Sequence, residues 1–225
     1  EVFARENEVK GNRQSATEAY LLASMAYHFA CNNSPQNLDE YIPAAKKRVE
    51  CYAKAAPYLD PPAERHEVPF ENFQMAAYLR VPQGIKRPPV VVIVSGLEST
   101  KEEARTMEDG FLRRGMATFT FDGPGQGESW FQGGMIVEFE HATSAVIDYL
   151  EKLSEVDAKR LGVFGPSLGG YLAPRSAACD PRIACSNGAA YYSRIGASSK
   201  SDELTLRIVS LLLASQCFSV DAVSR

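Results

Sequence analysis

The stretch Gly165–Gly170, which reads GPSLGG, decides how this 225-residue chain is interpreted. It follows the apolar segment Leu161–Phe164, typical of a buried strand, and leads into a segment with helical spacing, Leu168–Ala178. A serine with a glycine two residues before it and another two residues after it, between a strand and a helix, is the pattern of a sharp turn that exposes the hydroxyl. We therefore predict a strained backbone at Ser167 and interpret it as a candidate nucleophile. The alternative is a glycine-rich turn carrying an ordinary serine.

Outward from this turn, the chain alternates between strand and helix patterns. We expect a hairpin at Glu67–Phe70 and Phe73–Val81, further strands at Val90–Val94, Ala117–Phe121, Arg160–Phe164 and Ile183–Asn187, and helices at Thr100–Arg114, Phe139–Leu153 and Leu168–Ala178. The continuous β-branched run at Val90–Val94 is typical of a strand buried on both faces. Such alternation predicts an α/β fold, with a mostly parallel central sheet and helices on both of its faces.

Residues 1–60 follow a different pattern, which predicts helices. The sequence Ser15–Glu18, SATE, fits a capping box with Ser15 as the N-cap residue. A second helix is expected over Leu38–Tyr58. Three prolines then break the helical pattern: Pro57, Pro61 and Pro62. We therefore divide the chain into an N-terminal helical segment, 1–60, and an α/β domain, 61–225.

The second helix contains a basic triplet, Lys46-Lys47-Arg48. A charge run of this kind is usually a solvated helix face, and we favour that interpretation. A phosphate-binding role is the alternative.

Ser95–Glu98 follows the buried strand Val90–Val94 directly. A loop in this position donates a backbone N–H to the oxyanion in folds with a serine turn, and Leu97 is the candidate donor, with Gly96 allowing the bend. The N–H of Leu168, at the start of a helix, is the candidate second donor. Gly165 and Gly169 provide the room that the turn needs.

Glu98 has two interpretations. It could lie beside the nucleophile and assist it, provided that partial burial lets the carboxyl keep a proton. It could instead precede the first helical turn, where a carboxylate meets the positive end of the helix dipole. Spacing alone favours the structural role.

Another glycine-rich loop, Asp122–Ser129, follows the strand Ala117–Phe121 and reads DGPGQGES. Loops at the carboxyl ends of parallel strands border ligand sites. The sequence contains neither a GxGxxG fingerprint nor a Walker pattern, so we interpret the loop as a scaffold beside the site rather than a phosphate cradle.

Composition narrows the function classes. Lys and Arg number 24 against 28 Asp and Glu, a net charge of −4, without the basic stripe that nucleic-acid binding requires. No apolar run approaches the roughly 20 residues that span a bilayer, and the N-terminus has no signal-peptide pattern. The five cysteines form no CxxC pair or zinc spacing and are expected to be buried free thiols, which favours the cytoplasm. They are Cys31, Cys51, Cys179, Cys185 and Cys217. We predict no metal.

Four segments in combination resemble the 2,6-dihydroxypseudooxynicotine hydrolase group of the α/β-hydrolase superfamily, and its fungal relatives that shorten polyketides. They are Gly96–Glu103, Arg114–Thr118, Phe121–Glu128 and Gly165–Arg182. The resemblance covers roughly residues 10–190 and extends to the helical N-terminus.

The resemblance implies hydrolysis of a carbon–carbon bond next to a ketone, in an aromatic or polyketide-like small molecule, with Ser167 as the nucleophile and without a cofactor. It implies that Glu98 contributes to catalysis, which reverses the preference from spacing. It also implies that the N-terminal helices cap the site and that the protein is a homodimer. A carboxylester hydrolase and a non-catalytic pseudo-hydrolase are the alternatives.

One feature departs from the hydrolase pattern, in which serine, acid and histidine follow in that order. The three histidines, His28, His66 and His141, all precede Ser167. His141 falls in a predicted helix, where a structural role is favoured. The triad acid is not identified among the three later aspartates: Asp180, Asp202 and Asp221.

Past residue 190 the last strands of the fold are not visible, and 204–214 reads as an apolar helix. We therefore expect a truncated or frame-altered hydrolase with an open sheet edge and low solubility. Completion of the site by a second chain is the alternative.

Overall fold

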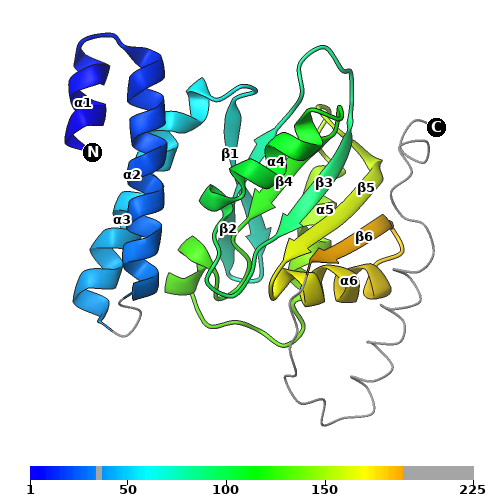
Figure 1. The fold of residues 1–225 in the computed structure, drawn as a ribbon. Helices are drawn as coiled ribbons and strands as arrows, with labels where there is room; N and C mark the ends of the chain where they lie inside the picture. Colours follow the sequence, from blue (N-terminus) through cyan, green and yellow to red (C-terminus); the bar gives the residue numbers. More distant parts are fainter. Residues whose placement is uncertain (34–36, 190–225) are drawn as a thin grey trace.

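A six-stranded sheet forms the centre of the computed structural model, which describes residues 1–33 and 37–189 (Figure 1). The strands are β1 (Ala63–Phe70), β2 (Phe73–Arg80), β3 (Pro89–Val94), β4 (Ala117–Phe121), β5 (Asp157–Pro166) and β6 (Ile183–Ala189). Their order across the sheet is β1-β2-β4-β3-β5-β6. The hairpin β1–β2 and the pair β2–β4 are antiparallel, whereas β4, β3, β5 and β6 run parallel. The predicted α/β fold with a mostly parallel sheet is confirmed.

The β-branched run of β3 is buried on both faces, as predicted. Alternate residues point to opposite sides of a strand. Val90, Val92 and Val94 accordingly pack in one core cluster with residues of α5 (Glu140–Leu150) and α6 (Gly169–Cys179). Val91 and Ile93 pack in another, against α4 (Arg105–Leu112). Helices therefore cover both faces of the sheet.

The N-terminal segment is helical and lies beside the β1–β2 side of the sheet (Figure 1). It contains α1 (Val2–Val9), α2 (Arg13–Asn33), α3 (Leu38–Ala55) and the short 3₁₀ turn η1 (Ala56–Tyr58). These helices share a small core of their own, which includes Tyr20 and Cys51. Tyr52 of α3 packs on Tyr78 of β2, with ring centroids 4.8 Å apart, and so joins the helices to the sheet.

Ser15 is not the N-cap that its local pattern predicts. Helix α2 begins at Arg13, and the N–H of Ala16 donates to the carbonyl of Asn12 at 2.9 Å. The helix starts early because the chain reverses just before it, through a turn in which Gly11 has φ of +75°.

The single helix expected at Thr100–Arg114 is divided into a 3₁₀ turn, η2 (Lys101–Glu103), and α4. Asp122 caps the start of η2, because the backbone N–H of Lys101, which has no helical acceptor so near a helix start, donates to Asp122 Oδ1 at 2.9 Å. A further 3₁₀ turn, η3 (Gly127–Phe131), lies within the glycine-rich loop after β4.

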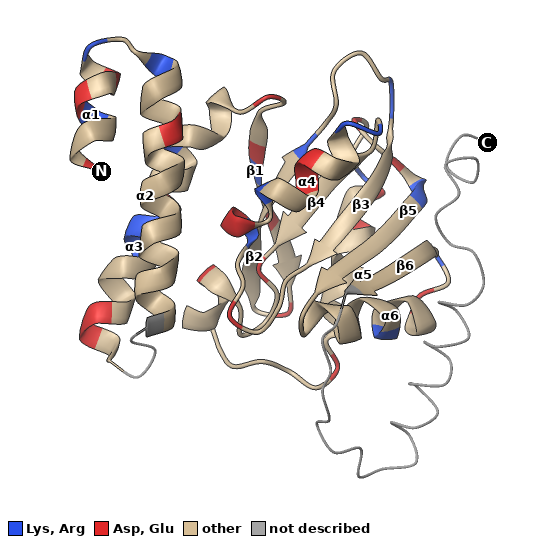
Figure 2. Cartoon of the chain, viewed as in Figure 1, with Lys and Arg blue, Asp and Glu red and all other residues tan. Residues whose placement is uncertain are grey.

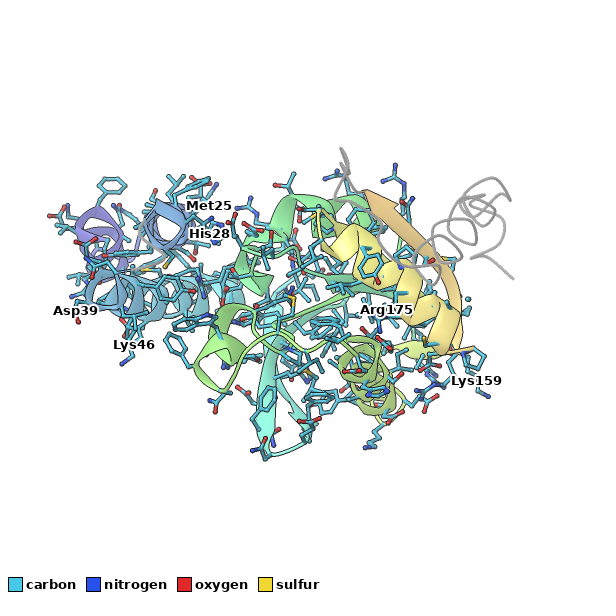
Figure 3. All side chains as sticks on the ribbon, turned by 90° about the horizontal axis from the view of Figure 1, so that it is seen from below. Met25, His28, Asp39, Lys46, Lys159 and Arg175 are labelled. Atoms are coloured by element: carbon cyan, nitrogen blue, oxygen red, sulfur yellow. The ribbon has the colours of Figure 1, made fainter. Side chains whose placement is uncertain are left out.

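The solvated-face interpretation of the basic triplet is wrong for one residue. Lys46 is exposed and points away from α3 (Figure 3), and Lys47 is half-buried. Arg48, in contrast, is 1% exposed. Arg48 is buried because α3 packs against η2. The sequence of the triplet alone does not indicate this contact.

Four cysteines in the described residues are free, as predicted, but only Cys31 and Cys51 are buried. Acidic and basic side chains are interspersed over the described chain (Figure 2). Among the described residues, no helix is long and apolar enough to cross a membrane. The predicted helix at 204–214, together with Cys217, Asp202 and Asp221, lies outside the described residues.

Candidate active site

Ser167 lies on the sharp turn that the sequence predicts. Strand β5 ends at Pro166 and α6 begins at Gly169, with Leu168 as its N-cap residue. The backbone of Ser167 has φ of +53°, a left-handed conformation that costs an L-residue about 1–2 kcal/mol. The side chain is exposed. The predicted turn geometry is confirmed, whereas the role of Ser167 in chemistry remains a prediction.

The glycines on either side of Ser167 are required by close packing of the backbone. A Cβ on Gly165 would lie 2.0 Å from the carbonyl oxygen of Gly169, and a Cβ on Gly169 would lie 2.0 Å from that of Val94. Real Cβ atoms do not approach oxygen so closely, so both positions exclude any side chain. The turn is thereby pressed against the end of β3.

The loop after β3 adjoins Ser167. A Cβ on Gly96 would lie 3.2 Å from the Cβ of Ser167. Among the described residues, neither the N–H of Leu97 nor that of Leu168 donates a hydrogen bond to the protein. Both donors are therefore free for a ligand oxygen, which is what an oxyanion hole needs.

Glu98 is exposed. The partial burial on which its predicted catalytic role depends is therefore not found. The helix-start role is weakened too, because the acidic residues in the first turn of η2 are Glu102 and Glu103. Both roles of Glu98 remain predictions.

Sequence reasoning missed a buried ionic cluster beside this loop. The ammonium of Lys101, fully buried, lies 2.5 Å from Glu102 Oε1, 2.8 Å from Asp122 Oδ2 and 2.6 Å from Glu128 Oε1. The three carboxylates gather as metal ligands do, but here they share the Lys101 ammonium. Asp122 was visible only as the first residue of the DGPGQGES loop, and no local signal pairs it with Lys101.

Charge controls protonation in this cluster. Burial alone would raise the pKa of Glu102, but the positive charges of Lys101 and Arg48 outweigh it and hold that pKa at about 2. Burial would lower the pKa of Lys101, yet the surrounding carboxylates raise it above its usual value. Lys101 and Glu102 are therefore ionised at neutral pH, whereas burial raises the pKa of Asp122 above its usual value.

The glycine-rich loop after β4 is tied to the loop after β3, as expected of a scaffold. The side-chain amide of Gln126 donates to the carbonyls of Ser95 and Gly96, both at 2.9 Å. The hydroxyl of Ser129 donates to the carbonyl of Asp122 at 2.7 Å. The two loops thus form one unit beside Ser167.

None of the three histidines has a hydrogen bond or an ion pair with Ser167 in the part of the chain that the structure describes. His28 lies 2.8 Å from Glu103 Oε2, and a ring nitrogen of His66 lies 3.0 Å from the hydroxyl of Tyr149. His141 is exposed on α5. Asp180 pairs with Arg182 at 2.7 Å and accepts from Ser144 at 2.8 Å. No histidine of this chain is bonded to Ser167 in the described structure.

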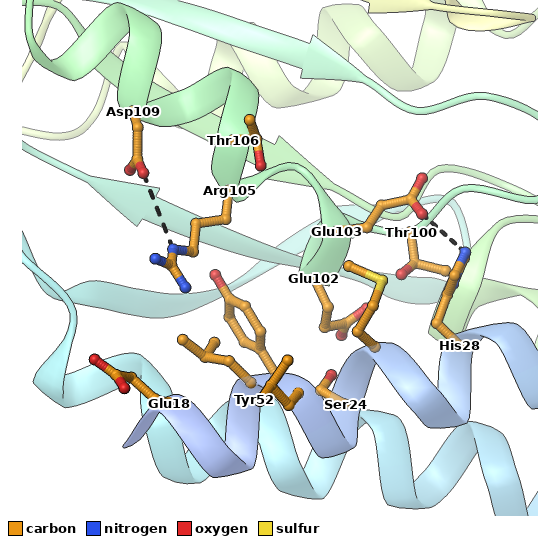
Figure 4. A pocket seen from close by; sticks show the side chains of 13 residues that line it. Glu18, Ser24, His28, Tyr52, Thr100, Glu102, Glu103, Arg105, Thr106 and Asp109 are labelled. Atoms are coloured by element: carbon orange, nitrogen blue, oxygen red, sulfur yellow. Dashed lines mark ion pairs between the residues drawn. The ribbon is translucent and has the colours of Figure 1, made fainter. Parts of the chain in front are cut away.

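Several cavities lie where the N-terminal helices meet the α/β domain. One of about 500 Å³ lies beside Tyr58 and Arg80. Two others adjoin the segment after β3. The larger, about 450 Å³, is bounded by α2 on one side and by η2 and α4 on the other (Figure 4). Three of its four carboxylates are in ion pairs: Glu103 with His28, Asp109 with Arg80 at 3.0 Å, and Glu102 with Lys101. The fourth, Glu18, accepts from the side-chain amide of Gln14. The smaller, about 200 Å³, is lined by Leu97, Glu98 and Ser99, and also by residues of α2 and α3. Thr100 borders both.

Comparisons with known proteins agree with this geometry. The mostly parallel sheet with a left-handed serine between β5 and α6 defines an α/β-hydrolase fold. The crystal structure of 2,6-dihydroxy-pseudo-oxynicotine hydrolase is similar, with a TM-score of 0.78 and 37% identity, over 98% of this chain and 62% of that one. The family model described as esterase FrsA-like matches residues 2–204, and the chain belongs to this family.

Curated relatives are named hydrolases. The chain is 51% identical over 138 residues to 2,6-dihydropseudooxynicotine hydrolase of Paenarthrobacter nicotinovorans, covering 61% of this chain and 38% of the relative. It is 34% identical over 201 residues to 20-hydroxy-prefusarin hydrolase FUS2 of Gibberella moniliformis, covering 81% of this chain and 47% of the relative. The chain thus spans less than half the length of these relatives.

Proposed function

We propose that this chain carries the nucleophile and the oxyanion hole of a serine hydrolase that cleaves a carbon–carbon bond next to a ketone. The observation that carries the proposal is the left-handed, exposed Ser167 on the turn between β5 and α6, beside Gly96. The names of the hydrolase relatives support the reaction class.

In this mechanism Ser167 Oγ attacks the ketone carbon and gives its proton to a base. The N–H groups of Leu97 and Leu168 stabilise the tetrahedral oxyanion, as fixed donors do in a site that excludes water. The carbon–carbon bond then breaks, and its electron pair leaves on the neighbouring fragment as an enolate, which takes up the proton. Water hydrolyses the remaining acyl-serine to a carboxylic acid.

The base is the part of the mechanism that the three histidines of this chain do not supply. His28 and His66 are engaged with Glu103 and Tyr149, and His141 is exposed on α5. Triad hydrolases use a histidine for this step. We therefore place the base outside the 225 residues.

We also propose that residues 1–60 act as a cap. Cys31 of α2 and Tyr41 of α3 line the same 200 Å³ cavity as Leu97 and Glu98. A cap of this kind limits the shape of substrate that reaches Ser167 and excludes water from the reaction.

Imidazole tests the nucleophile because it can replace a missing histidine base. A fluorophosphonate probe should label the chain at Ser167, with a rate that rises at least about tenfold in millimolar imidazole, since an activated serine is the group the probe modifies. Ser167→Ala should abolish labelling, whereas Ser154→Ala, at an exposed site in the loop before β5, should not. Equal labelling of the Ser167→Ala variant would contradict the proposal.

A carboxylester hydrolase is the second candidate, favoured by the esterase family to which the chain belongs. The two reactions share Ser167 and the oxyanion hole and differ in the leaving group. In imidazole, cleavage of benzoylacetone would support carbon–carbon hydrolysis. Turnover of 1-naphthyl acetate alone would favour the ester reaction.

Glu98→Gln tests whether this carboxylate takes part. A catalytic role predicts a loss of at least about tenfold in imidazole-supported kcat/KM, roughly 1.4 kcal/mol, with little change in Tm. Unchanged kcat/KM would remove Glu98 from the mechanism.

A further inference from the structure

The smaller cavity contains a buried cation that the fold does not fully use. Arg48 of α3 lines this cavity and is 1% exposed. Its Nε lies 3.4 Å from Glu102 Oε2, but neither Nε nor Nη2 has a hydrogen-bond partner among the described residues. The other oxygen of Glu102, Oε1, is held by Lys101 at 2.5 Å. Nε therefore faces a carboxylate oxygen that also has no hydrogen-bond partner among the described residues, and Nη2 is the donor that remains for a ligand.

Free donors on a buried guanidinium are unusual. A guanidinium carries five N–H donors in a planar fork and stays charged in proteins. Burying such a donor without an acceptor costs roughly 1–3 kcal/mol, more for charged groups. A ligand oxygen bound at Arg48 would remove this cost, and an anionic oxygen would do so most effectively.

One carboxylate also lines the cavity, and its charge opposes that of Arg48. Glu98 is exposed, so water and salt screen its charge. Arg48 is buried, where charges act through a lower effective dielectric. The buried carboxylates Glu102 and Asp122 also act on Arg48, but Lys101 shares their charge, so Arg48 remains the cation that lines the cavity.

Aromatic side chains form another wall. Tyr41 of α3 and Trp130 of η3 pack together with ring centroids 5.0 Å apart, and Trp130 is 38% exposed. Both line the cavity. Aromatic faces of this kind bind planar rings. The cavity thus combines a planar apolar wall with a cationic donor, next to Leu97.

We propose that Arg48 is a specificity-determining residue that binds an anionic oxygen, an enolate or a phenolate, on a planar substrate held against Tyr41 and Trp130. This inference rests on the proposed function, since it describes the substrate of the same site. A ring with an ionised enol at Arg48 can place a neighbouring carbonyl near the N–H of Leu97, because both groups line one cavity of about 200 Å³.

A pair of matched probes tests the proposal by binding alone. The enolate of 1,3-cyclohexanedione is planar at its enol system and anionic at neutral pH. Its methyl enol ether, 3-methoxy-2-cyclohexenone, has nearly the same shape without the charge. Calorimetric titration of the 225-residue chain should give a Kd for the enolate at least about tenfold below that of the ether.

Variants locate the preference. Arg48→Met should bring the two Kd values together, and Arg48→Lys should reduce the preference several-fold, because an ammonium lacks the planar fork. Trp130→Leu should weaken both probes by a similar factor. The control is Arg105→Met, an exposed arginine that lines the larger cavity, which should keep the full preference.

The outcomes separate this inference from the proposed function. A wild-type preference below about twofold, or one lost in Arg105→Met, overturns it, and both measurements stand even if Arg48→Met fails to fold. Fluorophosphonate labelling of Ser167 does not enter these titrations. Binding without labelling would therefore reject the nucleophile and keep the role of Arg48, and labelling without preference would do the reverse.

Discussion

The turn at Ser167 and the cluster around Lys101 lie beside the same loop but are held by different forces. At the turn, backbone atoms pack so closely that Gly165 and Gly169 admit no side chain. At the cluster, a buried ammonium holds three carboxylates at 2.5–2.8 Å. The turn depends on glycines that have no side chain, and the cluster depends on the balance between the Lys101 ammonium and its carboxylates. They should therefore respond differently to substitution and to pH.

The largest effect is expected at Lys101. Lys101→Met removes the cation and leaves its carboxylates buried beside one another, which typically costs about 3–5 kcal/mol when one partner of a buried pair is lost. Urea unfolding monitored by circular dichroism measures the change. Lys159→Met, at an exposed position, should stay within about 0.5 kcal/mol of the wild type. A loss below 1 kcal/mol at Lys101 would show that the cluster is dispensable for folding.

A smaller loss is expected at the turn. Gly169→Ala places a methyl group against the carbonyl oxygen of Val94 and should cost about 1–3 kcal/mol, the range for overpacking. Gly133→Ala is the matched control, because a Cβ there meets nothing within 4 Å. Equal melting temperatures for the two variants would indicate that the turn relaxes easily.

Acid should affect the cluster and not the turn. The pKa of Glu102 is held at about 2, below its usual 4.5, by Lys101 and Arg48 against the effect of burial. A depressed pKa contributes stability that is complete above 4.5 and is lost as the pH falls towards 2, because the unfolded chain takes up the proton first. Its slope is at most about 1.4 kcal/mol per pH unit for one proton.

Glu102→Gln removes this titration, so the variant should lose less stability than the wild type between pH 5 and pH 3. Gly169→Ala should follow the wild-type pH dependence. Parallel curves for the wild type and Glu102→Gln would contradict the assignment of the depressed pKa to Glu102.

The smallest effect has the opposite sign. Ser167→Gly relieves the left-handed strain at φ of +53° and should stabilise the fold by about 1 kcal/mol, while labelling at this position is lost. Ser154→Gly, where φ is not positive, should be neutral or destabilising. Differential scanning calorimetry distinguishes the two. A lower Tm for Ser167→Gly would mean that the turn is not strained.

The turn at Ser167 could be predicted from the sequence, whereas the cluster around Lys101 could not. Strands β3 and β4 were found because buried β-branched and aromatic runs are local signals, and the turn at Ser167 because its glycines are adjacent in sequence. Lys101 and Asp122 are 21 residues apart, and no pattern announces their contact.

Arg48 illustrates the limit most clearly. Lys46 is exposed, as expected of a charged helix face, and Lys47 is half-buried. Arg48, the third residue of the triplet, is buried because α3 packs against η2. Burial at this position depends on the contact between Arg48 and Glu102, which are more than 50 residues apart in the chain. Composition cannot supply it.

The amide of Gln126 has a consequence for the direction of a dipole. It fixes the carbonyl oxygen of Gly96, which belongs to the same peptide group as the N–H of Leu97. In a planar trans peptide these two bonds point in opposite directions, so an anchor on the oxygen orients the hydrogen. The side chain of Gln126 therefore orients the N–H of Leu97 before any substrate binds.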